Sequence, residues 1–267
     1  MLKIFSKITC AILLTVVSST AMSEEKKITF AGSSTIIPIM ESLAPVFTKY
    51  GQPTAIQGGG SSAAFKAVRD GMADIGMVSR SLTASELKKY QHFAFAGDLI
   101  VIIAHQSNPI SDINDATIRA IYTGEKTSWD HGKSITVISK ESGRATQEVF
   151  EQHFKLFGQV TPKAVVIGAN GQAIASVEND PQAIAYVSYD SAMAAQKNGS
   201  AIKILALNGV SPSMDAAKSQ DYQLKRELNL IYTEQSEQAM IKVKQILKTA
   251  EADEVLHHHS VINYGKI

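Results

Sequence analysis

The sequence predicts an α/β protein of alternating strands and helices, with sheets whose strands run largely parallel. Short apolar runs typical of strands alternate along the chain with longer stretches whose apolar residues recur at helical spacing. Several of these strands end in residues rich in Gly, Ser and Thr that open the next helix. Of the 267 residues, 45% are hydrophobic and 19% are charged, which is typical of a globular chain that buries one large or two moderate domains.

Residues 1–23 have the pattern of a cleaved secretory signal peptide. A basic start precedes an apolar run over residues 8–17, and small residues then allow cleavage after Ala21 or Ser23. The run is too short and wrongly flanked to be a membrane anchor. The single cysteine, Cys10, lies inside the run and not after it, so we expect neither a lipid anchor nor a disulfide in the secreted chain.

Strands and helices are expected to follow one another in a regular order. The strands are expected at residues 27–31, 54–57, 73–78, 93–104, 134–138, 165–167, 183–187, 202–207 and 228–232. The helices are expected at residues 36–47, 61–70, 112–122, 147–157, 172–178 and 236–250, with a further helix start at Thr83. The stretch 93–104 is strongly apolar but too short to cross a bilayer, so we expect a buried strand there.

Three strand-to-helix junctions share a composition that suits an anion, at residues 32–35, 58–62 and 139–146. The glycines of the second junction let the backbone turn sharply and approach a ligand, and Ser61 and Ser62 then open the helix. The free N–H groups of a helix start carry a partial positive charge that favours an anion. One junction alone would be an ordinary capped turn, but the repetition indicates a site for a tetrahedral oxyanion.

The sequence favours recognition over catalysis. The Gly132-Lys133-Ser134 run lacks the first glycine of a phosphate-binding P-loop and precedes a strand, and no Gly-x-Ser-x-Gly nucleophile elbow is present. His257-His258-His259 is interpreted as a solvated basic helix end, so neither a metal nor a cofactor is expected. The 26 Lys and Arg residues balance 25 Asp and Glu residues, so no nucleic-acid or membrane-surface partner is expected either.

Several of these motifs, in this order, resemble those of the periplasmic phosphate-binding proteins of phosphate ABC transporters. The resemblance covers nearly all of the chain after the signal peptide and is carried by residues 31–35, 57–62, 73–80, 121–124 with Trp129, and 140–146. It implies a two-lobed α/β periplasmic-binding-protein fold, with a ligand cleft between lobes that two crossing segments join. Lobe 1 would comprise residues 24–103 and 225–267, and lobe 2 residues 104–224.

The same resemblance implies a function. The chain would be a soluble periplasmic monomer, not an enzyme, that captures inorganic phosphate and delivers it to the membrane permease of an ABC transporter. Lobe 1 would supply donors from its helix starts, and lobe 2 would close over the anion with the start of another helix. The phosphate-binding residues implied in this way are Ser34, Thr35, Ser61, Ser79, Arg80, Arg144, Ala145 and Thr146.

The chain departs from the family pattern at four positions. Ser79 stands where some members carry an aspartate that accepts the proton of hydrogen phosphate, so rejection of sulfate is less secure. Lys140 replaces an arginine and cannot make its forked contact, whereas Arg144 and Ala145 stand where serine and glycine are usual.

Alternatives remain open at this point. The ligand could be another oxyanion such as sulfate, the role could be phosphate sensing without import, or the protein could be a secreted phosphatase-like hydrolase using Ser61 or Ser34. Arg80 could instead serve as a surface ion-pair partner, and Arg144 could pair with Glu141 or Glu148. Asp74, Trp129 and the Asn170-Gly171 turn are expected to be structural residues.

Overall fold

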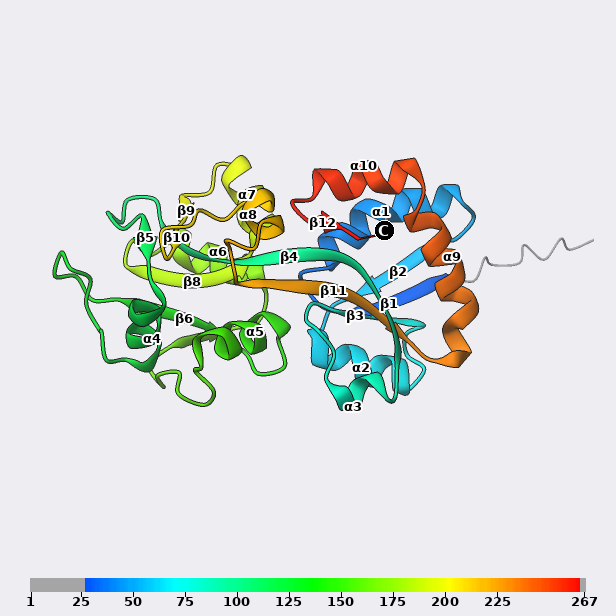
Figure 1. Ribbon diagram of the computed structural model, residues 1–267, viewed down its shortest axis with the longest axis horizontal. Helices are drawn as coiled ribbons and strands as arrows, with labels where there is room; N and C mark the ends of the chain where they lie inside the picture. Colours follow the sequence, from blue (N-terminus) through cyan, green and yellow to red (C-terminus); the bar gives the residue numbers. More distant parts are fainter. Residues whose placement is uncertain (1–26, 265–267) are drawn as a thin grey trace, which may run out of the picture.

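The computed structural model describes residues 27–264, and its chain forms two bodies that lie side by side (Figure 1). Two long strands, β4 (Gln91–His105) and β11 (Lys225–Tyr232), run from one body into the other. The expected signal peptide, with Cys10, lies outside the described residues. Within residues 27–264, none of the helices combines the length and apolar character needed to span a membrane.

The first body forms around three parallel strands that the N-terminal part of the chain supplies. Its strands are β1 (Ile28–Gly32), β2 (Thr54–Gln57) and β3 (Ile75–Val78), and β12 (Ile262–Asn263) joins the edge of β4. Its helices are α1 (Ile37–Lys49), α2 (Ser61–Arg69), α3 (Ala84–Leu87), the 3-10 helix η1 (Glu234–Ser236), α9 (Glu237–Leu247) and α10 (Ala250–His258). The C-terminal helices therefore pack on the N-terminal strands, and Phe30, Phe47, Leu230 and Met240 share one core.

The second body forms around β6 (Thr136–Lys140), β7 (Val165–Ile167) and β8 (Ala183–Ser188). Its other strands are β5 (Asp112–Ile113), β9 (Ile202–Ile204) and β10 (Ala206–Leu207). Its helices are α4 (Asp115–Thr123), α5 (Ala145–Phe154), α6 (Asn170–Glu178), α7 (Tyr189–Lys197) and α8 (Met214–Lys218). The Phe150 ring stacks on Tyr186 with ring centres 3.8 Å apart, which anchors α5 on β8.

One sheet runs through both bodies in the order β2-β1-β3-β11-β4-β8-β6-β7. The pairs β1–β2, β1–β3, β6–β7 and β6–β8 are parallel, as expected. The expectation of largely parallel sheets is wrong at the centre, where β4 and β11 pair antiparallel with each other, β11 pairs antiparallel with β3, and β4 pairs antiparallel with β8. The reason is that the chain leaves the first body along β4 and returns along β11.

Several of the expected elements have different bounds in the structure, and the strand expected at residues 202–207 is two strands, β9 and β10. The strand expected at residues 228–232 already begins at Lys225, because three polar residues at its start conceal the strand pattern. The helix expected at 236–250 is α9 and ends earlier, at Leu247, and after a break a helix that the sequence did not predict, α10, runs from Ala250 to His258. The break occurs where the Thr249 side chain accepts a hydrogen bond from the Ala252 N–H and so caps a new helix.

Candidate functional site

The three Gly/Ser/Thr-rich junctions meet at one small cavity between the two bodies. The cavity is lined by residues that follow β1, β3 and β6. Residues at the start of α2, and residues before and at the start of α6, complete the lining. We call it the anion cavity, and its lining residues are Ser33, Ser34, Thr35, Gly60, Ser61, Ser79, Arg144, Ala145, Thr146, Gly168 and Asn170. Because both bodies contribute, a ligand bound here would touch both.

The first body presents a tight set of hydroxyl groups. Gly32 has a φ of 136°, and a Cβ there would lie 2.4 Å from the Met77 carbonyl oxygen, so the turn after β1 requires glycine. The Ser33 hydroxyl donates to Ser79 Oγ at 2.8 Å, and the Ser79 N–H donates to Ser61 Oγ at 3.1 Å. These three serines are buried, and their mutual contacts fix the orientation of the hydroxyl groups before any ligand arrives.

The second body presents the first turn of α5. Arg144 is the residue that precedes the helix, and Ala145 and Thr146 are its first two residues. N–H groups in the first turn of a helix have no partner within the helix, so those of Ala145 and Thr146 are suited to an anion. The Ser62 N–H of the first body donates to the Gly143 carbonyl at 3.2 Å, which brings the two helix starts together.

Sequence reasoning missed a buried guanidinium between the two bodies, that of Arg226 on β11. Its side chain is 1% exposed, and it donates to Thr35 Oγ1 at 3.0 Å and to Thr146 Oγ1 at 2.8 Å. Its Nε and Nη2 also donate to Asp98 Oδ2 on β4, at 2.9 and 2.7 Å. The strand periodicity could have found Arg226, because it lies two residues before buried Leu228 and so shares its inward face.

The electrostatics around the anion cavity favour a negative ligand. Lys140 at the end of β6 is buried, and its Nζ has no hydrogen-bond partner among residues 27–264. Burial, with the nearby charges of Arg226 and Arg144, lowers the pKa of Lys140 to about 7. Burial raises the pKa of Asp98 to about 6, although Arg226 pulls it the other way. The basic groups of Lys140 and Arg226 therefore outnumber the carboxylate of Asp98 in this buried cluster. A bound anion would balance the excess positive charge.

Asn170 takes part in the cavity, beyond the structural role expected for its turn. As the first residue of α6, it lines the anion cavity. Its side-chain amide lies within hydrogen-bond distance of Thr35 Oγ1 at 3.4 Å and of Ser188 Oγ at 3.1 Å. By contrast, Asp74 and Trp129 are structural, as expected. Asp74 accepts from the N–H and hydroxyl of Thr29, and the Trp129 indole donates to the Gln182 carbonyl oxygen at 3.1 Å.

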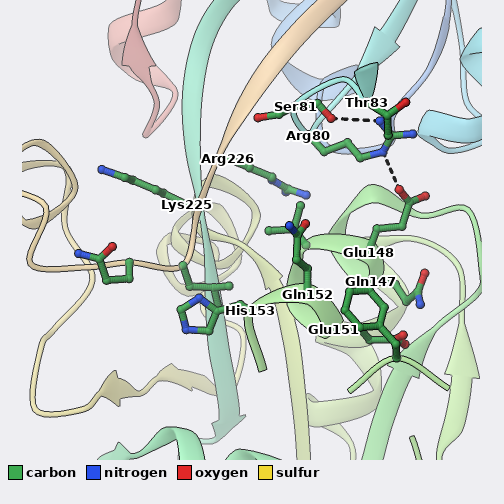
Figure 2. A pocket seen from close by; sticks show the side chains of 14 residues that line it. Arg80, Ser81, Thr83, Gln147, Glu148, Glu151, Gln152, His153, Lys225 and Arg226 are labelled. Atoms are coloured by element: carbon green, nitrogen blue, oxygen red, sulfur yellow. Dashed lines mark hydrogen bonds and ion pairs between the residues drawn. The ribbon is translucent and has the colours of Figure 1, made fainter. Parts of the chain in front are cut away.

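The anion cavity brings together all but one of the expected site residues, namely Ser34, Thr35, Ser61, Ser79, Arg144, Ala145 and Thr146. Arg80 is the exception. It lines a separate cavity of about 550 Å³ beside α5, where it pairs with Glu148 at 2.5 Å (Figure 2). Arg80 also pairs with Glu86, at 2.8 Å. Arg144 is also committed to an ion pair, since its Nε and Nη2 donate to Glu141 Oε2 at 3.1 and 2.8 Å.

Comparisons with known proteins agree with this architecture. A family model described as PBP superfamily domain matches residues 17–248. The phosphate-binding protein PstS 2 of Streptococcus pneumoniae is 37% identical over 106 residues, 39% of this chain and 36% of that protein. The phosphate-binding protein PstS of Borreliella burgdorferi is 23% identical over 223 residues, covering 78% of each chain. The match to the first of these relatives thus spans little more than a third of its length.

Solved structures give the same answer for the fold. A putative phosphate ABC transporter substrate-binding protein with bound phosphate from Clostridium perfringens superposes with a TM-score of 0.81 at 24% identity. The match covers 89% of this chain and 99% of that one. An ABC-type phosphate transport receptor from Vibrio cholerae has a TM-score of 0.72 at 26% identity, over 88% and 99% of the two chains. The two-lobed α/β fold expected from the sequence is confirmed.

Proposed function

The chain belongs to the PBP superfamily, and we propose that it captures inorganic phosphate in its anion cavity and delivers it to the permease of an ABC transporter. Its relatives include proteins named phosphate-binding proteins and a phosphate transport receptor, which supports this proposal. The expected signal peptide supports a periplasmic location, and we propose that the protein acts there as a monomer.

The two bodies are the proposed lobes. One hydrophobic core holds residues from Ile28 to Ala96 and again from Leu228 to Val261, and another holds residues from Leu99 to Leu224. This division supports a lobe 1 of residues 24–103 and 225–267 and a lobe 2 of residues 104–224, with the core boundary a few residues before 103.

The observation that carries the proposal is the position of Arg226. Its guanidinium contacts a threonine hydroxyl from each lobe, and both threonines line the anion cavity. A tetrahedral oxyanion can accept hydrogen bonds from a forked guanidinium and from the free N–H groups of two helix starts at once. We propose that Ser34, Thr35, Ser61, Ser79, Ala145, Thr146 and Arg226 hold the phosphate, with Lys140 supplying further positive charge.

A hydrolase is less well supported. No histidine and no carboxylate is among the described residues that line the anion cavity, so Ser34 and Ser61 lack a general base there. A Ser42–His259–Asp190 chain does exist at another edge of the lobes, with distances of 3.0 and 2.9 Å. However, Ser42 lies within α1, where backbone N–H groups are used by the helix and cannot stabilise an oxyanion.

Calorimetric titration of the secreted protein with phosphate, arsenate and sulfate tests this function. We expect one phosphate per chain, arsenate in competition with it, and weaker binding of sulfate. Incubation with a chromogenic phosphate ester should give no product. Tighter binding of sulfate would favour the other-oxyanion alternative, and steady turnover of the ester would favour the hydrolase.

A further inference from the structure

Arg80 is held in a fixed orientation by its own lobe. It follows β3, and its Nη1 and Nη2 donate to the two carboxylate oxygens of Glu86 at 2.8 and 2.9 Å. Glu86 is itself fixed by a capping box with Thr83 at the start of α3. The Arg80 guanidinium carbon also lies 5.4 Å from the centre of the Phe65 ring. These contacts leave Nε of Arg80 as the atom that faces the other lobe.

Glu148 meets Arg80 from lobe 2. Its Oε2 lies 2.5 Å from Arg80 Nε, and its Oε1 accepts a hydrogen bond from the Ser62 hydroxyl at 3.3 Å. Figure 2 shows the Arg80 and Glu148 side chains, which both line the 550 Å³ cavity, pointing toward each other and meeting directly. The side chains of Arg80 and Glu148 are 11% and 32% exposed, so solvent only partly screens this pair.

Glu148 also lies one helical turn from the anion cavity. It follows Ala145 and Thr146, which line the cavity, on the same helix α5. Any movement that swings the start of α5 away from lobe 1 therefore separates Glu148 from Arg80 and Ser62.

We propose that Arg80 and Glu148 form a latch that holds the lobes closed over the bound anion and so sets how slowly phosphate is released. This inference rests on the proposed function. The latch forms only when the lobes are together, so it adds to the barrier for opening and not to the first encounter with the ligand. The sequence predicts that Arg80 contacts phosphate. In the latch, Arg80 instead binds Glu148 of lobe 2, the lobe that covers the phosphate.

The size of the effect follows from the charges present. Arg80 already pairs with Glu86, and the pair with Glu148 is partly exposed, so the gain is smaller than for an isolated buried pair. We expect Glu148→Gln to speed phosphate release by about tenfold and to leave the association rate within about twofold.

The matched control is Glu141→Gln. Glu141 carries the same charge and pairs with Arg144, but both residues belong to lobe 2. Release of radiolabelled phosphate into an excess of unlabelled phosphate gives the rate for each variant. Glu141→Gln should release phosphate at the parental rate within about twofold. The Arg80→Met/Glu148→Gln double variant should release phosphate no faster than the faster of the Arg80→Met and Glu148→Gln single variants. Release from Glu148→Gln at the parental rate, or more slowly, would overturn the latch.

A second measurement tests the latch without phosphate. The only cysteine, Cys10, falls in the expected signal peptide, so spin labels can be placed at Lys66→Cys in lobe 1 and Gln159→Cys in lobe 2, both exposed positions. In the ligand-free protein, Glu148→Gln should populate longer distances between the labels than the parent does. Identical distance distributions would contradict the latch, whereas failure of the parent to bind phosphate would contradict only the proposed function.

Discussion

Arg226 and Asp98 lie directly opposite each other on β11 and β4, the two strands that cross between the lobes. Two donors of the guanidinium, Nε and Nη2, bind the same carboxylate oxygen, and neither side chain is more than 1% exposed. Burying such a pair costs much desolvation energy, and the attraction between the charges offsets that cost only when further hydrogen bonds satisfy the remaining polar atoms. Here Thr35 and Thr146, which line the anion cavity, accept hydrogen bonds from Nη2 and Nη1, so the pair holds the guanidinium against residues of that cavity.

Replacing Arg226 by Lys should weaken phosphate binding by at least tenfold, about 1.4 kcal/mol. An ammonium keeps the charge beside Asp98 but cannot reach the hydroxyl groups of both lobes in one plane. Calorimetric titration gives the affinity. Lys225→Ala, at the exposed neighbouring position, should bind phosphate as the parent does. Unchanged affinity in Arg226→Lys would remove Arg226 from the proposed site.

Asp98→Asn should lower the free energy of unfolding of the ligand-free protein by about 3 kcal/mol, because it leaves the Arg226 charge buried without its counter-ion. A bound anion would restore the balance of charge. Saturating phosphate should therefore raise the melting temperature of Asp98→Asn by more than it raises that of the parent. An equal rise in both proteins would show that the anion does not approach Arg226.

Lys140 should make both stability and binding depend on pH. Its pKa of about 7 in the folded protein is below the ordinary 10.5, so between these values the unfolded chain binds more protons. The free energy of unfolding should therefore rise as the pH rises from 7 toward 10, and Lys140→Met should lack this rise. An anion nearby would raise the pKa of Lys140, so phosphate binding at pH 8 should take up protons in the parent.

Calorimetry at pH 8 in buffers of different ionisation enthalpy measures that uptake. Lys140→Met should take up fewer protons per phosphate than the parent, while the phosphate's own ionisation contributes equally to both proteins. Equal uptake in the two proteins would mean that the Lys140 amine does not sense the ligand.

Arg144→Ala should keep the phosphate affinity within about threefold and lower the free energy of unfolding by only a few tenths of a kcal/mol. The sequence alone predicted that Arg144 contacts phosphate directly, so that its removal would weaken binding by more than tenfold, and kept the ion pair as the alternative. The pairing of Arg144 with Glu141 is the alternative that the structure supports. A loss of more than tenfold, with unchanged or increased stability without ligand, would restore Arg144 as a phosphate ligand.

Much of the site was predictable because it depends on local backbone chemistry. Gly32, Ser61 and Thr146 each lie at a strand end that opens a helix, and the turn, the free N–H groups and the positive end of the helix all follow from neighbouring residues. The parallel pairing of β1 with β2 and of β6 with β7 follows in the same way from the alternation of strands and helices.

Only the tertiary structure decided the contacts between residues that lie far apart in the chain. Asp98 and Arg226 are 128 positions apart, and their pairing depends on the register of two crossing strands that no local pattern specifies. Arg80 looked like a ligand because it follows a strand end, yet Glu86 and Glu148 take up its charge. A charged side chain pairs with whichever opposite charge the fold places nearest to it, so for Arg80, Asp98 and Arg226 the packing of the two lobes determined the role.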